Sequence, residues 1–129
     1  MGLFKKIFKQ KDQTKTDTQL PWIHLTTLNQ LAEIEAHSIS KTQLIFKHST
    51  RCGISRMVMK QFENNFDTSL NIELLYLDLL KYRDVSNAIE SKFQIGHESP
   101  QIIIIKNGNA VTHASHNDIN NLELNKLML

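Results

Sequence analysis

The sequence predicts an α/β fold with a mixed central sheet and helices on both faces. Short apolar segments typical of buried strands alternate with segments whose apolar residues recur at helical spacing. The last two strand segments are joined by Asn107 and Gly108, a pair that favours a tight hairpin turn. The 129 residues suffice for one core, and the hydrophobic content of 40% is typical of a globular protein.

We expect the folded part to begin with a short strand at residues 21–25, anchored by Trp22. A helix should follow, because the hydroxyl of Thr26 or Thr27 can cap its first backbone N–H groups. Residues 38–41 should end this helix. Its predicted apolar face comprises Leu28, Leu31, Ala32 and Ile34.

The next strand is expected at residues 42–47, leading into a loop that contains Cys52. A helix should follow this loop and end near Asp67. Its apolar residues are Ile54, Met57, Val58, Met59, Phe62 and Phe66. Residues 72–79 then predict a strand whose nearly continuous apolar residues indicate helices on both of its faces.

A weaker helix is expected around residues 84–94, because Val85, Ile89 and Phe93 recur at intervals of four. Gly96 is well placed to end it, since glycine readily adopts the left-handed conformation found after many helices.

An all-apolar strand is predicted at residues 101–106. The Asn107-Gly108 pair indicates a type I′ turn, and residues 109–114 should return antiparallel. Ser115 is expected to cap a last helix with Asp118 in its first turn. That helix should bury Ile119, Leu122 and Leu127.

The resulting order of elements is βαβαβα-ββα. Strands that alternate with helices require right-handed crossovers and a parallel core, and the closing hairpin makes the sheet mixed. This order is the thioredoxin-like arrangement.

Cys52 is the only cysteine of the chain and is a candidate nucleophile. With Ser49 or Thr50 as the N-cap, Cys52 would lie in the first turn of its helix. Free backbone N–H groups and the helix dipole favour a thiolate there, and Arg51 adds a nearby positive charge. The alternative is that Cys52 is a small buried apolar residue.

Ser55 follows Cys52 by three residues, where its hydroxyl could donate to the sulfur. A single cysteine excludes an internal disulfide and a multi-cysteine zinc site, and is compatible with a reducing cytoplasm. The histidines show no metal-binding spacing with a carboxylate, so no metal ligands are predicted.

Pro100 stands at the start of the 101–106 strand, where it cannot donate to the sheet. We expect the Ser99–Pro100 bond to be cis, the alternative being an ordinary trans proline. In the predicted topology this bend lies beside the Cys52 loop. A cis bond would present the backbone N–H and C=O of Ser99 to a thiol-bearing ligand.

Residues 1–20 are expected to form a flexible, basic N-terminal segment, and residues 21–129 a thioredoxin-like domain. The segment 2–9 alternates apolar residues with lysines and could contact an anionic membrane, but it is short for a stable helix, and we favour a solvated terminus. The net charge of +2 does not argue for nucleic acid, and no apolar run is long enough to span a bilayer. We expect a monomer.

Three blocks of residues together resemble a known family: 46–55 (Phe-Lys-His-Ser-Thr-Arg-Cys-Gly-Ile-Ser), 97–101 (His-Glu-Ser-Pro-Gln) and 113–119 (His-Ala-Ser-His-Asn-Asp-Ile). From about Trp22 to the C-terminus the chain is similar to the YtxJ family of bacillithiol-system proteins, the monothiol bacilliredoxins. The resemblance implies a thioredoxin-like fold, a Firmicute cytoplasm, Cys52 as nucleophile and Pro100 as the cis-proline. Gly53 departs from the family, which usually has proline there.

The function predicted from the residues and the resemblance is monothiol thiol–disulfide exchange that removes bacillithiol from S-bacillithiolated proteins. Bacillithiol would be a co-substrate, no cofactor would be tightly bound, and a second low-molecular-weight thiol would regenerate Cys52. Thiolate stabilisation is expected from Thr50, Gly53 and Ser55. Ligand binding is expected from His48, Arg51, Ser99 and Pro100, and Lys47 is a further candidate for binding carboxylates.

Two other functions remain open from the sequence. A single cysteine per chain could hold an iron–sulfur cluster in a dimer completed by external thiols, as in monothiol glutaredoxins. Alternatively, the domain could be a non-enzymatic interaction module in which Cys52 senses oxidation.

Overall fold

The strands form one mixed five-stranded sheet with the order β2-β4-β3-β5-β6. In this computed structural model residues 20–128 are described. The strands are β2 (Ile23–His24), β3 (Thr42–His48), β4 (Ile72–Asp78), β5 (Gln101–Lys106) and β6 (Asn109–Ser115). β4 pairs parallel with β2 and β3, and the other neighbours pair antiparallel, which confirms the predicted mixed sheet.

β3 is the central strand, and every one of its residues is buried. Its register with β5 places Lys47 opposite Gln101, and its register with β4 places His48 opposite Asp78. The carboxyl end of β3 therefore lies beside the start of β5 and the end of β4. The loop that contains Cys52 leaves the sheet at this point.

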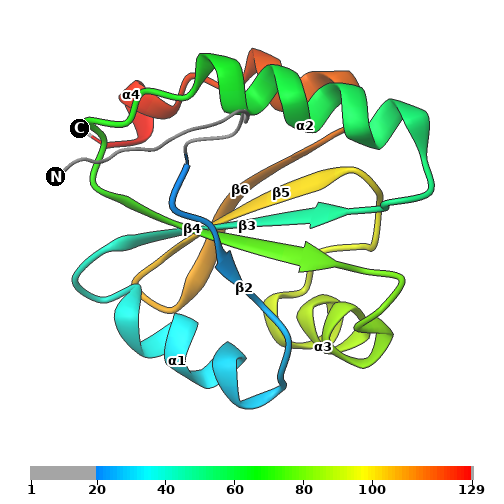
Figure 1. The fold of residues 1–129 in the computed structure, drawn as a ribbon. Helices are drawn as coiled ribbons and strands as arrows, with labels where there is room; N and C mark the ends of the chain where they lie inside the picture. Colours follow the sequence, from blue (N-terminus) through cyan, green and yellow to red (C-terminus); the bar gives the residue numbers. More distant parts are fainter. Residues whose placement is uncertain (1–19, 129) are drawn as a thin grey trace, which may run out of the picture.

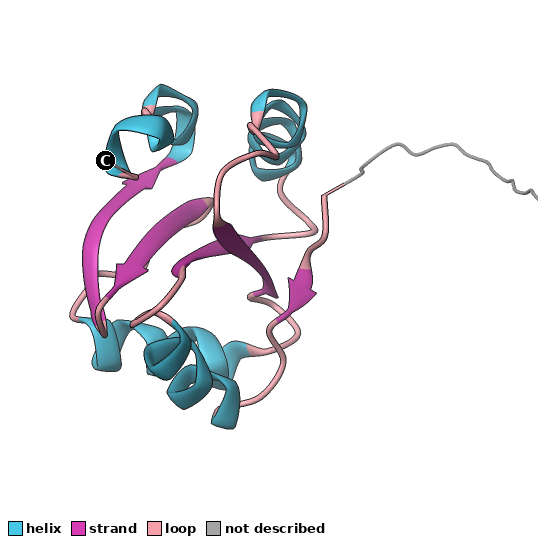
Figure 2. Cartoon of the chain, turned by 90° about the vertical axis from the view of Figure 1, so that its left-hand side faces the viewer, coloured by secondary structure: helices cyan, strands magenta, loops and turns pink. Residues whose placement is uncertain are grey.

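The helices lie in two layers, one on each face of the sheet (Figures 1 and 2). α1 (Asn29–His37) and α3 (Arg83–Phe93) cover one face, and α2 (Gly53–Asn65) covers the other with a 3-10 helix, η2 (His116–Asn121), and α4 (Leu124–Leu127). Successive residues of β3 point to opposite faces: Ile45 packs with α1 and α3, whereas Phe46 packs with α2.

The start of α1 differs from the prediction. Its N-cap position is Leu28, no side chain caps it there, and Leu28 is exposed. Instead, the side-chain oxygen of Gln30 accepts hydrogen bonds from the backbone N–H groups of Thr26 and Thr27, at 2.8 and 2.9 Å. The helix buries only Leu31 and Ile34 of its predicted apolar face.

α2 ends at Asn65 and buries Val58, Met59 and Phe62, as predicted, but Ile54 and Met57 are exposed. α3 ends at Phe93, and its C-cap residue Gln94 takes the left-handed conformation (φ 61°) that the prediction assigned to Gly96. Gln94 does so while its side chain donates a hydrogen bond to the carbonyl of Ser91.

The β5–β6 hairpin is confirmed, since Asn107 and Gly108 both have positive φ. The prediction of a single helix after this hairpin is wrong. Two short pieces, η2 and α4, occupy this region, and Ser115 makes no side-chain cap. Ile119 is buried as predicted, and Leu122 and Leu127 are half-buried against the same cluster.

The predictions for the basic N-terminal segment concern residues outside the described part of the chain, apart from Leu20. Between residues 20 and 128, no helix is long and apolar enough to cross a membrane.

Candidate functional site

Cys52 is the N-cap residue of α2, immediately before its first turn, with extended backbone angles (φ −109°, ψ 120°). The prediction that Ser49 or Thr50 caps this helix is therefore wrong. The Cys52 amide donates to the carbonyl of Ser49 at 3.2 Å, which closes the loop into a tight turn. Cys52 is a free, half-buried cysteine. It is therefore not the fully buried apolar residue that the sequence left open as an alternative.

No side chain caps the start of α2 within the described chain. The first amides of a helix have no partners inside the helix, so at this end they are directed at the position where Cys52 lies. The loop that ends β3 thus brings the cysteine to a cluster of backbone donors.

Ser55 is fully buried, and its hydroxyl lies 2.7 Å from Nδ1 of His48. The same hydroxyl accepts a hydrogen bond from the Ser49 amide at 3.1 Å. Ser55 therefore ties the first turn of α2 to the end of β3. Its predicted hydrogen bond to the Cys52 sulfur is not among the contacts of the described residues.

His48 is almost completely buried and lies beside the ring of Tyr76. Burial lowers the pKa of His48 below its usual value of 6.5, although the carboxylates of Asp78 and Glu63 oppose this shift. A neutral, enclosed imidazole does not support the predicted role of His48 in direct ligand binding. The structure places it behind the site, as a partner of Ser55.

Three neighbours of Cys52 in the sequence are exposed: Thr50 and Arg51 in the loop, and Gly53 at the start of α2. The guanidinium of Arg56 reaches back from α2 and donates to the carbonyl of Thr50 at 3.2 Å. A Cβ at Gly53 would lie 3.8 Å from this guanidinium. Arg56 was not among the residues predicted from the sequence; it stands four residues after Cys52 and so projects from the same side of the helix start.

The Ser99–Pro100 peptide bond is cis, as predicted. Pro100 is buried, and its carbonyl accepts a hydrogen bond from the His116 amide at 2.9 Å. Because Gln101 pairs with Lys47, the segment ending in Pro100 lies at the same end of the sheet as the Cys52 loop. The Ser99 hydroxyl is buried and has no hydrogen-bond partner among residues 20–128.

Lys47 lies on the opposite face of β3 from His48 and is fully buried. Its Nζ is 2.7 Å from Nδ1 of His97, in the segment that precedes Ser99. Burial lowers the pKa of Lys47 from 10.5 to about 8. The suggestion that Lys47 binds ligand carboxylates is therefore not supported, because its ammonium is already enclosed. A lysine at the end of an apolar strand was the available signal for an unusual role.

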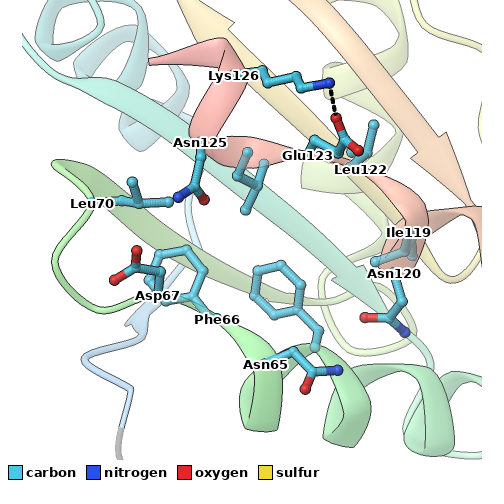
Figure 3. A pocket seen from close by; sticks show the side chains of 12 residues that line it. Asn65, Phe66, Asp67, Leu70, Ile119, Asn120, Leu122, Glu123, Asn125 and Lys126 are labelled. Atoms are coloured by element: carbon cyan, nitrogen blue, oxygen red, sulfur yellow. Dashed lines mark ion pairs between the residues drawn. The ribbon is translucent and has the colours of Figure 1, made fainter. Parts of the chain in front are cut away.

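A cavity of about 350 Å³ opens at the far end of α2 (Figure 3). Phe62, Phe66 and Ile119 form part of its apolar lining, and Glu123 and Lys126 form an ion pair at its edge. Cys52 does not line it, so the cavity is separate from the candidate site. No cluster of three or more potential metal ligands occurs in the described part of the chain.

Comparisons with known proteins agree with this architecture. The model of a family described as monothiol bacilliredoxin BrxC matches residues 23–124. A solved structure described as a candidate oxidoreductase with a thioredoxin fold is 31% identical, with a TM-score of 0.67, and the similarity covers 76% of this chain and 85% of that chain.

More distant structures share the fold. Thioredoxin NaTrxh from Nicotiana alata is 16% identical, with a TM-score of 0.69, and the similarity covers 88% of this chain and 96% of that one. Thioredoxin from Schistosoma mansoni is 18% identical, with a TM-score of 0.63, covering 83% and 92%. The predicted thioredoxin-like fold is thereby confirmed.

Proposed function

The chain belongs to the monothiol bacilliredoxin family, and on that premise we propose that it removes bacillithiol from protein mixed disulfides through Cys52. Family membership and the thioredoxin fold support a redox role in general. The observation that carries the specific proposal is the position of Cys52: a half-buried, free cysteine immediately before the first amides of α2 and at the same end of the sheet as Pro100.

The reaction begins with the Cys52 thiolate attacking the bacillithiol sulfur of the mixed disulfide. A disulfide forms between Cys52 and bacillithiol, the original disulfide breaks, and the protein cysteine leaves as a thiolate that takes up a proton. A second bacillithiol thiolate then attacks the bacillithiol sulfur held on Cys52. This step releases oxidised bacillithiol and regenerates the Cys52 thiolate, so in the net reaction the protein thiol is reduced and the second bacillithiol is oxidised.

The residues around Cys52 have separate roles in this proposal. Amides at the start of α2, including that of Gly53, stabilise the thiolate, and Ser55 holds this helix start against β3 through His48. The carbonyl of Thr50 orients the guanidinium of Arg56. With Arg51, this guanidinium gives the site a positive rim suited to a ligand that carries carboxylates.

Ser99 and Pro100 supply the opposite wall of the site. An extended ligand at this wall would bind through the backbone of Ser99, and the unpartnered Ser99 hydroxyl is an additional polar group near the same position. We place the reaction in the cytoplasm, where small thiols keep protein cysteines reduced.

The test uses the full chain and a peptide whose cysteine carries bacillithiol as a mixed disulfide. Wild type should release the free peptide thiol and gain the mass of bacillithiol on Cys52. Cys52→Ser should do neither. Thr112→Ser, a change of similar size on β6, is a matched control and should behave as wild type does. If wild type and Cys52→Ser leave equal amounts of blocked peptide, the proposed function is wrong.

A further inference from the structure

Lys47 is an unusual residue for the interior of this protein. Lysine is almost never fully buried unless it is paired, and its usual partner is a carboxylate. Here the side chain has no exposed surface, and the contact of its Nζ is Nδ1 of His97, at 2.7 Å. The protein thus keeps a cation inside the fold to bind a side chain on the segment between α3 and β5.

This segment is held from three sides. Besides Lys47, the carboxylate of Glu90 on α3 accepts a hydrogen bond from the His97 amide at 3.3 Å. The buried side chain of Gln101 donates to the carbonyl of Gly96 at 3.0 Å and accepts from the amide of Glu98 at 3.3 Å. These contacts fix the residues directly before Ser99 and Pro100.

The Lys47–His97 contact defines the protonation of His97. An ammonium can only donate, so the Nδ1 that faces it must be an unprotonated acceptor, and the ring proton is on Nε2. Partial burial of the ring lowers the pKa of His97, and the positive charge of Lys47 lowers it further. Arg83 acts in the same direction, whereas the carboxylates of Glu90 and Glu98 raise this pKa.

A second proton on His97 would point at the ammonium of Lys47 and convert the hydrogen bond into a repulsive contact. Because His97 is otherwise exposed, its ring can then turn towards water. Lys47 would lose its hydrogen-bond partner and keep only the attraction of the Glu90 carboxylate, and the segment before Ser99 would lose an anchor.

We propose that Lys47 and His97 are positioning residues that hold the Ser99–Pro100 segment against the Cys52 loop for ligand binding, and that protonation of His97 releases this segment. The inference rests on the proposed function. Neither residue touches the reacting sulfur atoms; both act through the wall of the site.

Three variants test the proposal in the exchange assay with the bacillithiol-blocked peptide. Lys47→Met and His97→Leu remove the contact and should lower kcat/KM by about tenfold or more, mainly through a higher KM, because ligand positioning is lost. His97→Asn offers Lys47 an acceptor oxygen that does not titrate. It should retain kcat/KM within about threefold of wild type at neutral pH.

The pH profile separates positioning from general stability. The pKa of His97 lies below 6.5, so wild type should lose its contact as the pH falls below 6.5, and the ratio of His97→Asn to wild type in kcat/KM should rise there. Alkylation of Cys52 by iodoacetamide should follow the same pH profile in all variants, because the thiol itself is unaffected. Lys60→Met and His37→Asn, exposed residues elsewhere, are matched controls and should behave as wild type does.

The proposal is overturned if Lys47→Met and His97→Leu keep the kcat/KM of wild type, or if the His97→Asn ratio does not change with pH. Failure of the proposed function has a different signature: wild type itself would not release the peptide thiol.

Discussion

Replacement of Lys47 by methionine should make the protein more stable while making it a poorer catalyst. Methionine fills nearly the same space but carries no charge. The pKa of Lys47 falls from 10.5 to about 8 in the folded protein, and at 1.36 kcal/mol per unit this corresponds to roughly 3 kcal/mol lost by keeping the ammonium buried near neutral pH.

The variant regains this free energy but gives up the hydrogen bond to His97, which is worth about 1 kcal/mol. The free energy of unfolding should therefore rise by roughly 2 kcal/mol at about pH 7. Urea titration followed by circular dichroism measures it, and the midpoint should move to higher urea without a change of slope.

The pH dependence of this difference has a definite sign. The folded-state pKa lies below the unfolded value, so from about pH 8 to about pH 10.5 the unfolded chain binds more protons than the folded protein. As the pH rises through this window, the free energy of unfolding of wild type should therefore rise relative to that of Lys47→Met. A variant that is less stable than wild type near neutral pH, or a difference that stays constant up to about pH 10, would refute the reasoning.

Three further outcomes are expected. Ser55→Ala leaves the Ser49 amide and Nδ1 of His48 without their buried partner, so unfolding in urea should require about 1–3 kcal/mol less, whereas Ser69→Ala, an exposed control, should cost much less. Because the pKa of His48 is lowered in the folded protein, the unfolded chain binds a proton at this residue first as the pH falls. The stability of wild type should therefore fall below pH 6.5, and that of His48→Gln should fall less. Plots of stability against pH that run parallel for the two proteins would contradict this. Gly108→Ala forces alanine to φ 82° and should lower the free energy of unfolding by about 1 kcal/mol, which would appear as a lower melting temperature. An unchanged melting temperature would contradict the assigned turn.

Much of the fold was predictable because its signals are local. The apolar runs of β3, β4 and β5 and the turn residues Asn107 and Gly108 determine their own structure through burial and backbone preference. Helix ends were less predictable, because several side chains compete to satisfy the same amides. The sequence contains Thr26, Thr27 and Gln30, and only the folded geometry selects Gln30 as the acceptor.

The same distinction applies to the candidate site. The candidate role of Cys52 and the cis bond before Pro100 could be predicted from their neighbours in the sequence. The Lys47–His97 contact could not, because it joins residues 50 positions apart and depends on the register of β3 against β5. Burial of His48 likewise follows from which face of β3 it occupies, and a strand with apolar residues on both faces does not reveal this.

Trp22, the single tryptophan of the chain, gives the protein an intrinsic optical probe. Its indole donates a hydrogen bond to Glu63 at 2.7 Å and contacts the ring of Phe62, both on α2. The helix that starts beside Cys52 therefore contacts this fluorophore some three turns further along. If the proposed exchange at Cys52 tilts that helix, the tilt should appear as a shift in tryptophan emission, and both steps of the proposed reaction could then be timed in a stopped-flow instrument without a label.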